Sequence, residues 1–120
     1  MDKNELIKQA ILAKKKCVSA VLTESGEIYS GCNIECASYT PTICAERVAI
    51  FKAISEGEKK IKAIAIAGDS SYTYPCGVCR QVIREFGKDA IIIVVNNENE
   101  YKEYTLNELL PYSFGPEDLG

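Results

Sequence analysis

The sequence predicts one α/β domain spanning residues 1–120, a three-layer α/β/α fold with a mixed five-stranded sheet. The first observation is the order of the expected elements: helix, two strands, helix, strand, helix, two strands, helix. The second is the length, because 120 residues fit a single domain with its own core. The third is the hydrophobic fraction of 47%, which is ordinary for a globular protein.

The amino-terminal third predicts a helix followed by a β-hairpin. Asp2 can cap a helix that runs to about Lys15, since its apolar residues recur at helical spacing. Cys17–Thr23 is typical of a strand, and the polar residues 24–27 form a turn. Ile28–Cys32 then returns as the second strand of the hairpin.

The middle of the chain predicts a long loop and a central helix. The loop covers Asn33–Pro41, and Thr42 can cap the helix, which stops at Gly57. This helix is apolar around most of its circumference, so we expect it to be central. Ile61–Ala67 is a strand, and a polar loop containing tyrosines continues to Pro75.

The carboxy-terminal part repeats the strand–helix–strand pattern, and both such units should be right-handed crossovers. The strand before the last hairpin is the most apolar segment, so we expect it to be the most buried strand. The expected elements are a helix at Cys76–Phe86 closed by Gly87, a strand at Ala90–Val95, an edge strand at Glu100–Tyr104 after a turn, a short helix capped by Thr105 and running through Leu110, and an irregular end at Pro111–Gly120.

Charge and cysteine content exclude several classes of protein. A net charge of −3 with scattered basic residues argues against a nucleic-acid polymer as partner. No apolar run approaches the ~18 residues of a membrane span. The charged start Met-Asp-Lys-Asn-Glu differs from a secretory signal, so we expect a cytoplasmic protein. In that reducing compartment, six cysteines indicate metal ligands, catalytic groups or buried apolar residues rather than disulfides.

A Cys-x-x-Cys pair, Cys76 and Cys79, opens one of the predicted helices, where the helix dipole favours thiolates. The pair alone fits a redox site, a structural zinc site or a catalytic zinc site. Cys44 lies at the start of another helix and offers a third thiolate, and Glu46 follows two residues later. We therefore favour a zinc ion held by three thiolates, with a water in the fourth position.

A site closed by protein remains an alternative. The chain has no histidine, so the fourth ligand would be Cys17, Cys32, Cys36 or a carboxylate.

Three thiolates leave Zn²⁺ with a net charge of about −1, which weakens its effect on a bound water. Arg47 and Arg80 each directly follow a site residue and are expected to donate to the thiolates.

Two blocks of the sequence carry a family resemblance. Cys44-Ala45-Glu46 together with Pro75-Cys76-Gly77-Val78-Cys79 match the zinc deaminase signature. The surrounding segments resemble the small homotetrameric zinc-dependent cytidine deaminases, and the resemblance covers nearly the whole chain; the segments are residues 31–35, 37–39, 42–47, 76–82, 109–111 and 113–116. It implies one zinc ion per chain, a nucleoside substrate, a homotetramer and a place in pyrimidine salvage.

The resemblance also implies roles for individual residues. The zinc-bound water attacks C4 of cytidine or deoxycytidine, and Glu46 takes its proton, passes one to N3 and protonates the departing ammonia. Asn33 and Glu35 match the Asn-x-Glu that grips the ribose 3′-hydroxyl. The backbone of Ala45 contacts the base, and Phe114 matches an aromatic residue that enters a neighbouring subunit's site.

The chain departs from the family before its first strand. Members carry an aromatic-Ser-x-Phe segment there, whereas this chain runs directly into Cys17 and lacks about nine residues, including the Phe that walls the pyrimidine pocket. Tyr39, Tyr72 or Tyr74 can take its place, or the pocket is wider. This motivates an alternative substrate, another aminopyrimidine such as blasticidin S. A zinc-stabilised binding protein without turnover is the alternative of a different class, against which Glu46 argues.

Overall fold

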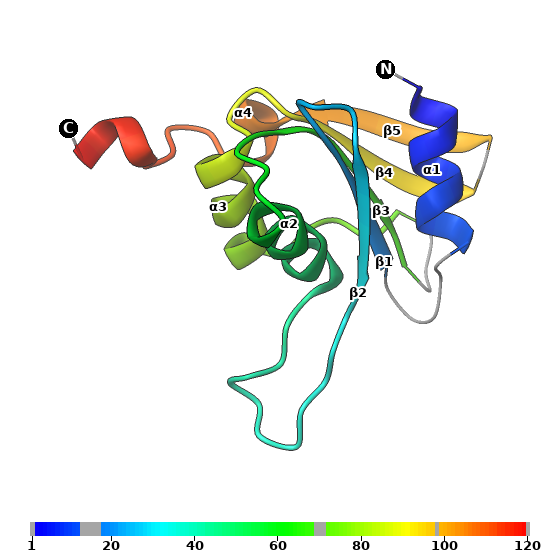
Figure 1. The fold of residues 1–120 in the computed structure, drawn as a ribbon, viewed down its shortest axis with the longest axis horizontal. Helices are drawn as coiled ribbons and strands as arrows, with labels where there is room; N and C mark the ends of the chain where they lie inside the picture. The colour runs from blue at the N-terminus through cyan, green and yellow to red at the C-terminus, as the bar shows by residue number, and fades with distance from the viewer. Residues whose placement is uncertain (1, 13–17, 69–71, 98, 120) are drawn as a thin grey trace.

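The fold consists of five strands in one sheet with helices on both faces, as the sequence predicts (Figure 1). A computed structural model describes residues 2–12, 18–68, 72–97 and 99–119. Its elements are α1 (Lys3–Leu12), β1 (Val18–Thr23), β2 (Ile28–Cys32), α2 (Ala45–Ser55), β3 (Ile61–Ala67), α3 (Gly77–Phe86), β4 (Ile91–Asn97), β5 (Glu100–Thr105), α4 (Leu106–Leu109) and a 3-10 helix (Pro116–Leu119).

The sheet has the strand order β2-β1-β3-β4-β5 and is mixed. β1 pairs antiparallel with both β2 and β3, whereas β3 and β4 run parallel, with Ile64 opposite Ile92. β5 closes the other edge antiparallel to β4. Because parallel neighbours need a crossover, α3 connects β3 to β4 across one face.

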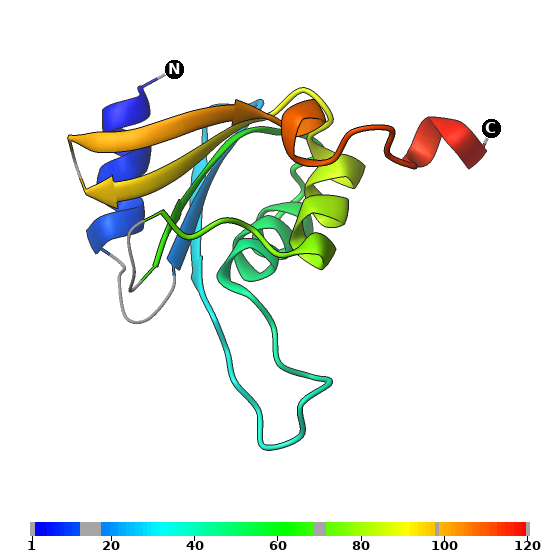
Figure 2. The ribbon, with the colours of Figure 1, turned by 180° about the vertical axis from the view of Figure 1, so that it is seen from behind.

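Alternation along the strands builds a separate core on each face of the sheet. On one face, α1 packs on a set that includes Ala63, Ala65 and Ala67 of β3. On the other face, α2 and α3 pack on a set that includes Ile64 and Ile66. Figures 1 and 2 show α1 on one side of the sheet and α2 and α3 together on the other. Both faces are covered, which is why the three central strands, β1, β3 and β4, are mostly apolar along their length.

Three expectations at the level of elements are wrong. Thr42 does not cap the central helix: Cys44 is the N-cap, and the Thr42 hydroxyl accepts a hydrogen bond from the backbone N–H of Cys36. β1, with all six residues buried, is more buried than β4, because it lies between two strands and under helices on both faces. The end of the chain is not wholly irregular, since it forms the 3-10 helix.

Other boundaries agree or lie outside the described residues. Cys76 and Thr105 cap their helices, and Thr105 with Glu108 forms a reciprocal capping box. The predicted extension of α1 to Lys15 and the start of the first strand at Cys17 fall outside the described residues. None of the helices described is long and apolar enough to cross a membrane.

Gly31 in β2 allows α2 to approach the sheet closely. A Cβ atom at this position would lie 2.7 Å from the backbone nitrogen of Ala49 and 2.9 Å from the Val48 side chain. Since backbone atoms cannot move aside cheaply, only glycine fits here. The contact fixes the distance between the sheet and the helix that begins beside Cys44.

We predict that Gly31→Ala lowers the free energy of unfolding by about 1–3 kcal/mol, the usual penalty for overpacking. Denaturant titration followed by circular dichroism measures the change. Gly77→Ala is the matched control, because no atom lies within 4 Å of a Cβ at Gly77. Equal stability of the wild type and Gly31→Ala would contradict the close packing of α2 on β2.

Candidate metal centre and active site

Three of the cysteines are brought together because they lie at the starts of two neighbouring helices. Cys44 is the N-cap of α2 and Cys76 is the N-cap of α3, and both have extended backbone conformations. Cys79 lies in the first turn of α3. α2 and α3 lie side by side on one face of the sheet, so residues distant in sequence meet at their amino-terminal ends (Figures 1 and 2).

The three sulfur atoms form a compact cluster. All three Sγ atoms lie within 4.8 Å of one another, and the Sγ atoms of Cys44 and Cys76 are 3.7 Å apart. Cys79 is fully buried, Cys44 is partly buried and Cys76 is exposed. Within the described parts of the chain, no other group of three or more potential ligands gathers in this way. Cys32 and Cys36 are free and outside the cluster, and Cys17 is outside the described residues.

Local electrostatics act on the thiols in opposite directions. Burial raises the pKa of Cys76, but hydrogen bonds, above all from the backbone N–H of Cys79, outweigh it and leave the pKa below its usual value. Burial raises the pKa of Cys79, and the carboxylate of Glu46 and the neighbouring sulfurs raise it further. Three anionic sulfurs this close would repel one another, so a bound cation would be needed to keep all three deprotonated.

Glu46 is buried beside this cluster. Its side chain is 3% exposed, and its Oε1 atom has no hydrogen-bond partner among the described residues. Burial raises the pKa of Glu46, while its own backbone N–H, Cys79 and Arg47 lower it in part. A buried carboxylate oxygen usually has a partner. Three thiols and this oxygen therefore fit a tetrahedral zinc with three sulfur ligands and one water within reach of Glu46.

The two arginines expected to donate to sulfur act differently. Arg47 donates from Nη2 to Sγ of Cys44 at 3.7 Å, in agreement with the expectation. Arg80 donates from Nε to the carbonyl of Pro75 and from Nη1 to the carbonyl of Leu109, both at 2.8 Å. Arg80 thus braces the backbone that leads into Cys76, and Arg47 places positive charge on the cluster itself.

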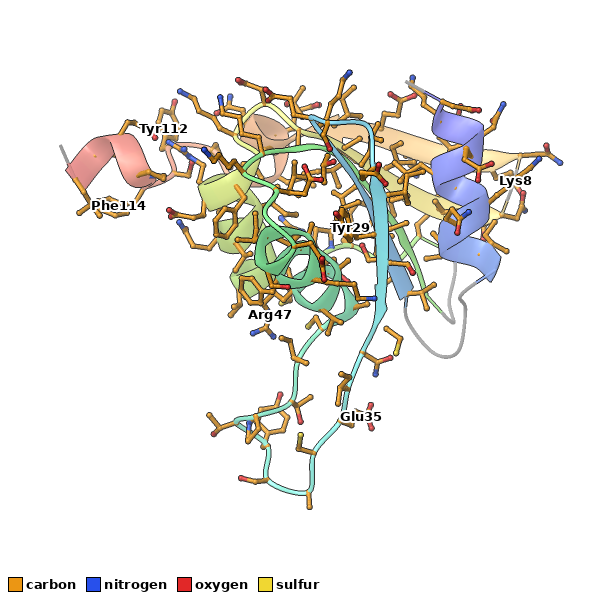
Figure 3. All side chains as sticks on the ribbon, in the orientation of Figure 1. Lys8, Tyr29, Glu35, Arg47, Tyr112 and Phe114 are labelled. Carbon is orange, nitrogen blue, oxygen red and sulfur yellow. The ribbon has the colours of Figure 1, made fainter. Side chains whose placement is uncertain are left out.

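The predicted sugar-binding pair, Asn33 and Glu35, is connected to the segment before Cys44 by a backbone bridge. Ile34 and Ile43 form an antiparallel bridge with two hydrogen bonds of 2.9 Å. This bridge holds Asn33 and Glu35 close to Cys44, and the Asn33 amide donates to Glu35 Oε1 at 3.4 Å. Figure 3 shows Glu35 on the loop that projects from the end of β2, away from the sheet. The sequence analysis missed the bridge, because a single bridge leaves no periodic signal in the chain.

The remaining predicted residues are spread over the molecule. Ala45 is fully buried at the start of α2. Phe114 is 57% exposed on the carboxy-terminal segment, which projects from the body of the protein (Figure 3). Tyr39 is 89% exposed in the loop, whereas Tyr72 lies under the ammonium group of Lys102, 4.5 Å from its ring centroid. The hydroxyl of Tyr74 bonds that of Tyr104 on β5 at 2.6 Å.

A three-sulfur centre at paired helix starts, on an α/β/α sheet and beside a buried carboxyl, defines the zinc-deaminase class of protein. The model of the cytidine and deoxycytidylate deaminase zinc-binding region matches residues 2–95, a range that contains Cys44, Cys76 and Cys79. The chain belongs to this family of zinc-binding proteins.

Full-length relatives and solved structures agree with this assignment. A cytidine deaminase of Sporosarcina psychrophila is 40% identical, covering 99% of this chain and 96% of that protein. One of Halalkalibacterium halodurans is 41% identical, with 99% and 98% covered. The cytidine deaminase structure from Burkholderia pseudomallei has a TM-score of 0.87 at 34% identity, covering 95% and 100% of the two chains. That from Mycobacterium tuberculosis has a TM-score of 0.81 at 32% identity, covering 96% and 98%.

The alignment to the Sporosarcina psychrophila protein also bears on the missing segment. It runs over 130 positions, while 99% of 120 residues is about 119, so this chain lacks a residue at about eleven aligned positions. This agrees in size with the segment of about nine residues that the sequence analysis places before Cys17. The position of that gap stays a prediction.

We predict about one zinc ion per chain in purified protein, measured by atomic absorption or mass spectrometry. Cys76→Ser should lose the metal, because removing one of three thiolate ligands weakens the site severely. Cys36→Ser is the matched control, since Cys36 is a free cysteine outside the cluster, and it should retain zinc. Zinc retained in Cys76→Ser, or lost equally in both variants, would contradict the three-cysteine site.

Proposed function

We propose that the protein hydrolyses the amino group of cytidine and deoxycytidine, giving uridine or deoxyuridine and ammonia. The observation that carries the proposal is the buried carboxyl of Glu46 beside three clustered thiols. Purely structural zinc needs no such carboxyl, whereas hydrolysis needs a group that moves protons. Relatives named cytidine deaminase, with nearly complete coverage of this chain, support the choice of substrate.

Cys44, Cys76 and Cys79 would hold the zinc ion, which when bound supplies the Lewis acidity that prepares a water as nucleophile near neutral pH. Glu46 accepts a proton from the attacking water and delivers one to N3 of the pyrimidine ring. A bond forms between the water oxygen and C4, and the C4–N bond breaks. Glu46 then takes the remaining proton from the new C4 hydroxyl and gives it to the amino group, which leaves as ammonia while the C4 carbonyl forms, so the same carboxyl serves as base and acid.

The raised pKa of Glu46 suits this double use. Burial raises the pKa of Glu46, which brings the carboxyl nearer to the neutral pH at which one group can both accept and release a proton. The Arg47 guanidinium, which donates to Cys44, offsets part of the negative charge of the sulfurs. That offset keeps the centre electrophilic enough for its task.

Recognition of the nucleoside rests on three other elements. Asn33 and Glu35, held beside Cys44 by the bridge between Ile34 and Ile43, offer an amide donor and a carboxylate acceptor to one ribose hydroxyl. The backbone of Ala45 contacts the base. Phe114, exposed on its own chain, reaches the site of a neighbouring subunit in a homotetramer.

The proposed setting is pyrimidine salvage in the cytoplasm. A centre built from three thiols is compatible with a reducing compartment, where cysteines stay available as metal ligands. The substrate is a small nucleoside, and neither a nucleic-acid polymer nor a membrane is a partner in this proposal.

A second candidate substrate is another aminopyrimidine, such as blasticidin S. The observation that favours it is the shorter chain, which lacks about eleven aligned positions present in a relative. Tyr72 contacts Lys102 of β5, and Tyr74 contacts Tyr104 of β5. These contacts argue against either ring replacing the missing Phe in the wall of the pyrimidine pocket. The proposed sugar grip by Asn33 and Glu35 favours the nucleoside.

We predict turnover of cytidine and deoxycytidine by zinc-loaded protein, followed by ammonia release and the ultraviolet change. Glu46→Gln should lower kcat by about 10²–10⁴-fold, because an amide cannot exchange the proton. Glu56→Gln, at the other end of α2, is exposed and serves as the matched control with wild-type activity.

Blasticidin S in the same assay separates the candidates. Turnover of blasticidin S alone would replace the nucleoside by the second candidate. No turnover of any of the three compounds by zinc-loaded protein would leave a zinc-stabilised binding protein. Full activity in Glu46→Gln would remove Glu46 from its role.

A further inference from the structure

The helix that carries Cys76 and Cys79 also holds the carboxy-terminal segment. Arg84, one and a half turns beyond Cys79 on α3, is only 7% exposed although it is charged. Its Nε donates to the Ser113 hydroxyl at 2.7 Å, and its two terminal nitrogens donate to the two carboxylate oxygens of Glu117. A two-pronged contact of this kind fixes direction as well as distance.

The segment is shaped to receive this guanidinium. A Cβ atom at Gly115 would collide with Arg84, so the chain passes directly over the planar group. The backbone N–H of Gly115 donates to Asp118 at 2.8 Å, which closes the turn into the 3-10 helix. The hydrogen bond from Arg84 holds the pKa of Glu117 well below its usual value, at about 2, so the carboxylate stays charged in use.

Phe114 lies between the anchored residues Ser113 and Gly115. Its backbone carbonyl accepts a hydrogen bond from Gln81 of α3 at 2.8 Å, while its ring is 57% exposed. The backbone is therefore fixed on both sides and the ring is presented outward (Figure 3). Tyr112 is fully exposed and Leu119 is 80% exposed, so the anchoring depends on Arg84 rather than on apolar packing of these two residues.

We propose that Arg84 is a positioning residue: by gripping Ser113, Gly115 and Glu117, it sets the pose in which Phe114 meets the nucleoside. This inference rests on the proposed function for the role of Phe114. α3 then has two tasks. Its N-cap and first turn carry Cys76 and Cys79 of the metal centre, and its later residues hold the backbone around Phe114.

Steady-state kinetics of two variants test the proposal. Arg84→Gln removes the grip from the helix side, and Glu117→Gln removes it from the exposed segment, where misfolding of the core is not at issue. Each should raise KM about tenfold, the effect of losing a hydrogen bond to a charged group, with kcat within about twofold and zinc content unchanged. Lys88→Gln is the control, because Lys88 lies 4.0 Å from Glu117, is well exposed and should leave KM unchanged.

A fluorescent reporter tests the anchoring without reference to turnover. The chain contains no tryptophan, so Phe114→Trp introduces a single indole at the anchored position. Its anisotropy should fall when Glu117→Gln is added and stay constant when Lys88→Gln is added. If anisotropy falls but wild-type protein shows no turnover, the anchor stands and the proposed function fails.

Several outcomes would overturn the positioning role. Unchanged KM in both variants would show that the grip does not affect substrate binding. A fall in kcat together with zinc loss would show that Arg84 merely supports the structure of α3. Constant anisotropy with Glu117→Gln would show that the pair does not hold Phe114.

Discussion

The close approach of three cysteine sulfur atoms is the constraint around which the site is built. The Sγ atoms lie within 4.8 Å of one another, with the carboxyl of Glu46 close by. Such a cluster of anions is stable only with a cation at its centre. Every element nearby serves that arrangement: two helix starts supply favourable dipoles, and Arg47 supplies a positive charge.

Precision at the centre comes from the sheet. α2 and α3 pack on the same face, and Gly31 lets α2 lie close to β2, so the two helix starts keep a fixed separation. The residues proposed to contact the substrate lie outside these helices and strands, in loops that are attached to them. Asn33 and Glu35 are tied to the centre by one backbone bridge, and Phe114 is tied to α3 by side chains. The metal site thus stands on packed helices and the sheet, while recognition rests on tethered loops.

Much of this could be predicted from the sequence, because the signals are local. Short apolar segments bounded by turns, helix periodicity and the Cys-x-x-Cys spacing indicate the strands, the helices and part of the cysteine cluster. Contacts between distant segments leave no such signal. Arg80 was expected to donate to sulfur and instead braces Pro75 and Leu109, and Thr42 was expected to cap a helix that begins at Cys44. Arg84 looks like an ordinary helix cation until the segment around Glu117 folds onto it.

The central claim is a zinc ion held by three protein sulfurs with one position left for water beside Glu46. X-ray absorption at the zinc edge of the purified protein tests it most directly. The account predicts three sulfur scatterers at about 2.3 Å and one oxygen at about 2.0 Å. Four sulfur scatterers would contradict it, because a site closed by a fourth cysteine holds zinc for structure and leaves no place for the water that hydrolysis requires.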